Sequence, residues 1–148
     1  MKPLSHVMTG HHQYCDELFA AVEAHVRQAD WPAAGTAWSR LHDCLDWHFR
    51  AEEDRLFPGF ESITGMVHGP TAVMREEHAQ LRELLAACAD ALGAQDAGRF
   101  AGHADSLLMV LQQHNYKEEN VLYPMCERML TMLAQDFATQ FANEIAAL

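Results

Sequence analysis

The sequence contains an internal repeat, and this repeat limits the folds that the chain can adopt. Residues 48–58 and 114–124 share the pattern H-x-x-x-E-E-x-x-L-(aromatic)-P and lie 66 residues apart. The same shift aligns His12 with His78 without a gap. It also matches residues outside the pattern: Met8 with Met74, Asp30 with Asp96, Leu41 with Leu107 and Leu45 with Leu111. Such a repeat indicates two copies of one structural unit.

Hydrophobic residues recur every three or four positions in both copies, which predicts amphipathic helices. Each copy has two such stretches. Pro58 predicts that the second helix of the first copy either ends there or kinks and continues for a short, frayed stretch. No alternating pattern typical of strands occurs. We predict an all-α, up-down-up-down four-helix bundle in which two helical hairpins cover about 5–62 and 71–128. An additional C-terminal helix is expected over about 125–147, within a single domain of residues 1–148.

The net charge and the cysteines limit the cellular compartment and the classes of binding partner that we expect. A net charge of −11 argues against nucleic acid and against an anionic membrane surface, because both require clusters of Lys and Arg. No apolar run is long enough to span a bilayer, and the first residues lack the apolar segment of a signal peptide. Four cysteines without C-x-x-C spacing indicate reduced thiols: Cys15, Cys44, Cys88 and Cys126. We expect a cytoplasmic protein with no nucleic-acid or membrane partner.

The repeated His and Glu residues predict a metal site inside the bundle. Side chains four residues apart lie on one helix face, so the imidazole and the carboxylate of each pattern can reach one ion. Burying four imidazoles and two carboxylates is costly unless a metal or a hydrogen-bonded network satisfies them. We favour the metal over the network. The predicted ligands are His12, His48, Glu52, His78, His114 and Glu118.

The types of ligand atom narrow the choice of metal. Each copy supplies two nitrogens and one oxygen, so two ions can each take two imidazoles while Glu52 and Glu118 bridge them. Imidazole and carboxylate without thiolate favour iron or manganese over structural zinc, which usually prefers a closed set rich in Cys. Few protein ligands per ion leave open positions for a bridging oxygen species and a small ligand.

The pattern resembles the hemerythrin-like family, the HHE cation-binding domain, over roughly residues 5–125. The resemblance implies two iron ions, with manganese and zinc less favoured. It also implies a lone His on the first helix, H-x-x-x-E on the second, a His on the third, and a His with a carboxylate on the fourth. The matching residues are those predicted above: His12, His48 with Glu52, His78, and His114 with Glu118.

Two departures from the oxygen-carrying hemerythrins matter. Those proteins have H-x-x-x-H on the third helix, but here Met74 lies four residues before His78. Their fourth helix has H-x-x-x-x-D, whereas here Glu118 and Glu119 lie four and five residues after the His. We favour Glu118 as the ligand, because the fifth position is turned about 140° away on a regular helix. Glu119, like Glu53, is then expected to support the ligands from outside or to lie at the surface.

Other residues are weaker candidates. His11 is an alternative to His12 or an extra ligand. Neighbouring helical side chains point about 100° apart, so only one of the two can face the centre squarely, and the repeat favours His12. Tyr14 or Tyr116 is considered as a hydrogen-bond donor to a bound ligand. Glu77 is a candidate ligand or surface acid, and Met74 is expected to pack around the site. The histidines without a repeat mate are expected at the surface: His6, His25, His42, His68 and His103.

The resemblance implies a small ligand at the metal pair, either a diatomic (oxygen or nitric oxide) or peroxide. The missing imidazole favours a role in nitrosative or oxidative stress, or in iron-sulfur repair, over oxygen transport. A reversible oxygen-binding or sensing module and an iron store or donor stay open as alternatives. Whether the chain is an enzyme, which would require a redox partner, and its oligomeric state are left open by the sequence.

Overall fold

The computed structural model describes residues 1–148, and its first helical hairpin consists of α1 (Leu4–Arg27) and α2 (Trp31–Ala51). The turn between them forms because Ala29 adopts a left-handed conformation (φ 54°) and Asp30 accepts a hydrogen bond from the Ala33 N–H at 3.2 Å. α2 continues through one π-helical turn, η1 (Glu52–Leu56), into α3 (Phe57–Thr64).

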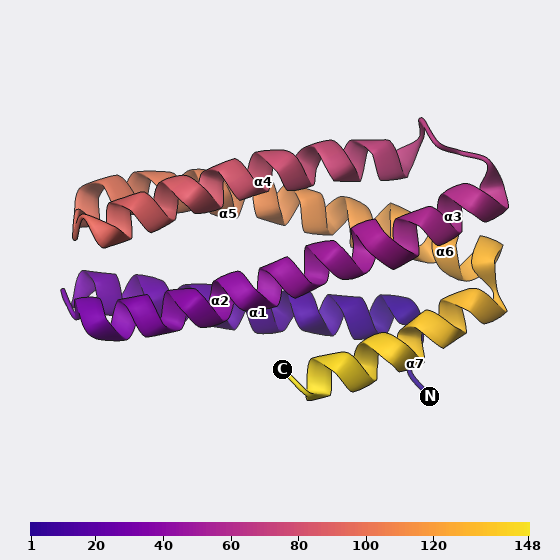
Figure 1. Ribbon diagram of the computed structural model, residues 1–148, viewed down its shortest axis with the longest axis horizontal. Coiled ribbons are helices and arrows are strands. Elements are labelled where there is room, and N and C mark those ends of the chain that lie inside the picture. Colours follow the sequence, from indigo (N-terminus) through magenta and orange to yellow (C-terminus); the bar gives the residue numbers. More distant parts are fainter.

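The second hairpin repeats this construction. α4 (Pro70–Gly93) leads to α5 (Ala97–Lys117), and α5 continues through a second π-helical turn, η2 (Glu118–Leu122), into α6 (Tyr123–Leu130). Gln95 has the same φ of 54° as its repeat mate Ala29, and Asp96 caps the Arg99 N–H at 3.0 Å. The two hairpins lie side by side with both turns at the same end (Figure 1). The predicted all-α bundle of two helical hairpins is confirmed.

A seventh helix, α7 (Met132–Ala146), turns back towards the N-terminus along the first hairpin (Figure 1). The break before it lies at Thr131, where φ is 46°. The C-terminal helix was expected from about residue 125, but the structure continues α6 to Leu130 and starts the last helix at Met132. The additional helix is therefore present and shorter than expected.

Each π-helical turn is separated from a following proline by one aromatic residue. The Phe57 N–H bonds to the Glu52 carbonyl and the Tyr123 N–H to the Glu118 carbonyl, five residues back. Pro58 and Pro124 have no N–H and would clash with the carbonyl four residues earlier in a regular helix. The wider turn accommodates the proline, so the helix continues past it as α3 in the first copy and as α6 in the second. Such turns often occur at functional sites.

The hydrophobic core is divided into two clusters, one towards each end of the bundle. The first surrounds Phe19, Trp38 and Phe100 near the hairpin turns. The second gathers around Phe60 and Phe141, where α3, α6 and α7 pack. Between the two clusters lies a layer of buried polar side chains. None of the helices combines the length and the apolar character needed to cross a bilayer.

Candidate metal centre

Six buried side chains from the four long helices and the two π-helical turns meet in the layer between the apolar clusters. Each is at most 4% exposed: His12, His48, Glu52, His78, His114 and Glu118. Regular helix geometry before each π turn places each Glu one turn after its His, and the hairpins bring the two pairs face to face. All six residues predicted as ligands are thus brought together.

The two carboxylates lie between imidazoles of both repeats. Glu118 Oε1 is 3.2 Å from the Nε2 atoms of both His12 and His114, and 3.8 Å from that of His48. Glu52 Oε1 lies 3.6 Å from His48 Nε2 and 3.2 Å from His78 Nε2. Each carboxylate therefore touches imidazoles of both hairpins, which is the position that a bridging ligand requires.

The donor atoms fit a pair of cations. Two groups have all their ligand atoms within 4.8 Å of one another: His12, His48 and Glu118, and Glu52, His78, His114 and Glu118. Several of these atoms are buried without a hydrogen-bond partner, namely Glu52 Oε1, His78 Nε2, His114 Nε2 and Glu118 Oε2. Buried polar atoms are rarely left unpaired, so these atoms are suited to coordinate a cation between them.

In three of the four imidazoles, the ring nitrogen that points away from the centre, Nδ1, is hydrogen-bonded to a carboxylate. His12 Nδ1 lies 2.7 Å from Glu119 Oε2 and His78 Nδ1 lies 2.7 Å from Glu53 Oε2, so the repeat mates Glu53 and Glu119 have matching roles. His114 Nδ1 lies 2.9 Å from Glu77 Oε1. In each case only the imidazole can donate. These bonds keep the proton on Nδ1 and leave Nε2 free for an ion.

The fourth imidazole, that of His48, differs from the other three because its Nδ1 is not bonded to a carboxylate. His48 Nδ1 is bonded to His11 Nδ1 at 2.9 Å, and His11 stands at the repeat position of Glu77. Burial, together with the neighbouring His48 and His12, lowers the pKa of His11 to about 3, so this imidazole is neutral. Both His11 and His12 are buried, but only His12 directs a nitrogen at the carboxylates.

Without an ion, protons hold the cluster together. Burial alone would lower the pKa of His48, but Glu52 and Glu118 outweigh burial and raise it to about 10. Burial would also lower the pKa of His114, but Glu118 and the other nearby carboxylates outweigh burial and raise it to about 9. Burial would raise the pKa of Glu118, yet His114 and other neighbours hold it well below its usual value. An incoming cation would replace the imidazolium protons.

Tyr123 is a residue of the centre that the sequence analysis did not select. Its hydroxyl donates to Glu52 Oε2 at 2.8 Å or to Glu118 Oε1 at 3.0 Å, and it lies 3.2 Å from His48 Nε2. Burial and the two carboxylates raise its pKa well above the usual value. Its position is the aromatic one of the repeated pattern, where the first copy has Phe57. Because the two copies share only an aromatic ring at this position, the repeat gave no indication of a hydroxyl in the centre.

The weaker candidates lie around the centre or away from it. Tyr116 is 67% exposed, and the Tyr14 hydroxyl accepts a hydrogen bond from Arg40 at 3.2 Å, so neither lies among the ligands. Both tyrosines had been considered only as weaker candidates for a hydrogen bond to a bound ligand. Met74 is buried in the apolar cluster of α3, α6 and α7. Of the histidines without a repeat mate, His6, His42 and His68 are exposed, and His25 and His103 are half-buried.

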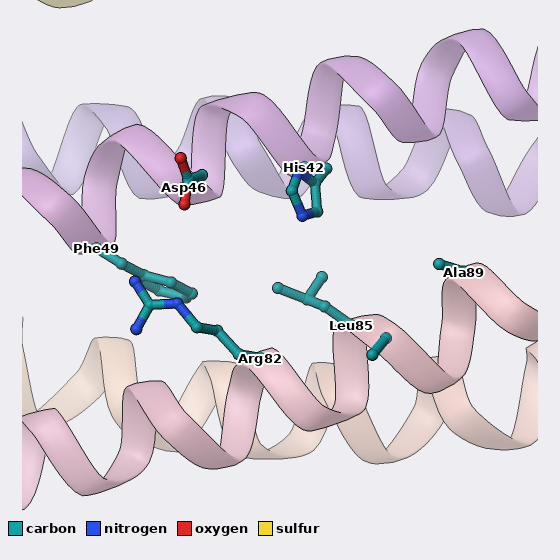
Figure 2. A pocket seen from close by; sticks show the side chains of 7 residues that line it. His42, Asp46, Phe49, Arg82, Leu85 and Ala89 are labelled. Carbon is teal, nitrogen blue, oxygen red and sulfur yellow. The ribbon is translucent and has the colours of Figure 1, made fainter.

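A cavity of about 260 Å³ opens beside the centre, between α2 and α4 (Figure 2). Phe49 and Arg82 lie side by side at one end of it, and His42 and Asp46 line its α2 wall. The Phe49 ring stacks on His78 with centroids 4.3 Å apart, and the Arg82 guanidinium lies over the Phe49 ring, 5.3 Å from its centroid. Phe49 therefore separates the cavity from the imidazole of His78.

Comparisons with known proteins agree with the geometry. The family model of the hemerythrin HHE cation-binding domain matches residues 4–126, which include all six candidate ligands. Curated proteins and solved structures give no significant match. The match covers both helical hairpins and the buried His and Glu cluster that they enclose. The chain thus belongs to the hemerythrin family, as an HHE cation-binding domain.

Proposed function

We propose that this hemerythrin-family protein holds two iron ions, bridged by Glu52 and Glu118, and binds a small ligand at the pair. The observation that supports this most directly is the contact of each buried carboxylate with imidazoles of both repeats. Two separate mononuclear sites would not need carboxylates shared in this way. The proposed ligand is oxygen, nitric oxide or peroxide.

The donor set supports iron as the metal. Both groups of candidate ligands consist of imidazole and carboxylate and contain no thiolate. Such sets suit iron and manganese better than structural zinc. Bound iron would supply redox chemistry, while the chain's own residues orient the ligands and exclude water. The carboxylates of Glu53, Glu77 and Glu119 hold three imidazoles in the ligating tautomer.

The donor count supports an open coordination position. Met74 occupies the position at which the resemblance to oxygen-carrying hemerythrins implies a further imidazole, and it packs in the apolar cluster. The cavity outside Phe49 offers a route for a small uncharged molecule to the His78 side, through movement of that ring. These features favour the handling of nitric oxide or peroxide in stress defence, or in iron-sulfur repair, over oxygen transport. We place this role in the cytoplasm, with a redox partner supplying electrons.

Metal loading tests the proposal. The Glu52→Ala/Glu118→Ala variant removes both bridging candidates and should lower the iron content from two ions per chain to well below one, with the helical circular dichroism retained. The measurement is metal analysis of protein reconstituted with ferrous iron without oxygen. The matched control is Glu76→Ala/Glu83→Ala, which removes two exposed carboxylates and should keep two ions.

Ligand binding is tested on the same samples. The ferrous protein should develop new visible absorption with nitric oxide or oxygen, and the bridging variant should not. Retention of two ions per chain in the bridging variant would overturn the bridging assignment. A wild-type protein that takes up no iron would overturn the proposed function.

A further inference from the structure

At one pair of equivalent aromatic positions, the two halves of the centre differ by a single oxygen atom. Tyr123 stacks on His12 with ring centroids 5.9 Å apart and an interplanar angle of 26°. Its repeat mate Phe57 stacks on His78 at 5.6 Å and 28°. The two aromatic rings are thus placed alike by the repeated helices. Only the His12 half has a hydroxyl, because the sequence has Tyr in one copy of the pattern and Phe in the other.

The Tyr123 hydroxyl is directed at the donor atoms of one metal position. It lies 3.4 Å from His12 Nε2 and 3.2 Å from His48 Nε2. The carboxylate oxygens Glu52 Oε2 and Glu118 Oε1 lie 2.8 and 3.0 Å away. Tyr123 is completely buried. Its oxygen therefore has four candidate donor atoms as its polar neighbours.

These distances match those between neighbouring donors around a single ion. Donors at about 2.1 Å from an octahedral metal lie about 3 Å from each other when they are adjacent. An oxygen at that distance from four other donors has the position of a ligand that caps them. A phenol that is only hydrogen-bonded donates its single proton to one carboxylate and accepts from an imidazole N–H. Here the oxygen lies within 3.4 Å of two carboxylate oxygens and two imidazole nitrogens.

We propose that the Tyr123 oxygen is a ligand of the metal ion held by His12 and His48. This inference rests on the proposed two-metal function. On coordination the phenol O–H bond breaks, the proton passes to solvent, and an oxygen lone pair forms the bond to the metal without any change in electron count. Phe57 offers no donor at the equivalent place. The ion between His78 and His114 therefore keeps the position for a small exogenous ligand.

Resonance Raman spectroscopy of the diferric protein tests the assignment. A tyrosinate bound to ferric iron gives a visible charge-transfer band in which ring vibrations of the tyrosine are enhanced. We expect this band in the wild type and its loss in Tyr123→Phe with two irons retained. The chain has three tyrosines, so Tyr14→Phe/Tyr116→Phe leaves Tyr123 as the only one. That double variant should keep the band, and it assigns the signal even if Tyr123→Phe does not fold.

The possible failures are distinguishable. A wild-type protein with two ferric ions and no enhanced tyrosine modes would overturn this inference alone, as would modes that survive in Tyr123→Phe or vanish in Tyr14→Phe/Tyr116→Phe. A chain that binds no iron would overturn the proposed function and this inference with it. Azide added to the diferric protein should bind while the tyrosinate modes persist. Displacement of the tyrosinate by azide would contradict the placement of the open position at the other ion.

Discussion

The partner of each outer imidazole nitrogen distinguishes the two halves of the centre. Both His78 and His114, in the second repeat, are bonded to carboxylates. In the first repeat His12 is bonded to Glu119, but His48 is bonded to the neutral His11. A carboxylate partner makes a ligating imidazole a stronger base than a neutral partner does. An ion at His12 and His48 would therefore receive less negative charge from the residues around its ligands, and the proposed Tyr123 ligand would compensate for this.

Replacing Glu119 by Gln should weaken metal binding without removing a ligand. The amide keeps the shape of the carboxylate but loses its charge, so the hydrogen bond from His12 Nδ1 becomes weaker. Substitutions of this kind typically lower metal affinity by about 10- to 100-fold. Competition with a coloured chelator measures the change. Glu76→Gln, at an exposed position, should leave affinity unchanged; equal affinities in the two variants would show that Glu119 does not support the site.

The residues of the centre could be predicted from the sequence where the repeat shows them twice. His12, His48 and Glu52 each have a mate of the same type 66 residues later, so a chance match is improbable. Tyr123 could not be predicted, because its mate is Phe57 and the shared property is an aromatic ring. His11 was a candidate because it adjoins His12, but its hydrogen bond to His48 could not be predicted, because the equivalent bond in the other copy comes from the carboxylate of Glu77. The repeat thus identifies functional residues that both copies share, but not those that have a role in only one copy.

At the scale of the elements, periodicity predicted the four long helices but not their continuation. A proline normally marks the end of a helix, and the sequence offers no sign that a π-helical turn will carry the chain past Pro58 and Pro124. Those turns matter because they keep Phe57 and Tyr123 on the helices that carry Glu52 and Glu118. The break at Thr131 also escaped prediction, since the apolar stripe runs through it and threonine rarely adopts a positive φ.

The docking of α7 depends in part on one carboxylate. Glu144 accepts two hydrogen bonds from Arg55, at 2.6 and 2.8 Å, and one from Trp47 Nε1 at 3.0 Å. These contacts join α7 to α2 and η1. The bonds from Arg55, assisted by that from Trp47, lower the pKa of Glu144 below its usual value. The carboxylate is 41% exposed, so solvent screens the ion pair and its contribution is modest.

Replacing Glu144 by Ala should lower the free energy of unfolding of the metal-free protein by about 1 kcal/mol at neutral pH. Because folding lowers the pKa of Glu144, its stabilisation is complete above the usual carboxyl pKa and is lost as the pH falls through the lowered value. Urea unfolding at pH 7 and at pH 3.5 should show the difference between variant and parent shrinking in acid. Asn143→Ala, at an exposed neighbouring position, should match the parent at both values. An unchanged difference at low pH would refute the ion-pair explanation.

At the scale of the whole molecule, the metal centre separates the two apolar clusters. On α1, His12 lies between Met8, which belongs to the cluster around Phe60, and Cys15, which belongs to the cluster around Phe19. Just before Glu52, Phe49 and Ala51 likewise belong to different clusters. Each cluster has its own large aromatic residues and can remain packed without the ion. Protons on His48 and His114 pair with the carboxylates in the metal-free state, so the bundle is expected to stay folded when the metal is removed.

Removal of the metal should lower the melting temperature without unfolding the chain at 25 °C. A ligand present at 100 times its dissociation constant stabilises the folded state by about 2.7 kcal/mol. In a chain of this size each kcal/mol corresponds to about 2–4 °C, so a chelator should lower the melting temperature by about 5–10 °C. Thermal circular dichroism of loaded and chelated protein measures the shift. Glu52→Ala/Glu118→Ala should show no such shift, because it has lost the shared carboxylates; a shift of equal size in that variant would mean that the stabilising ions bind elsewhere.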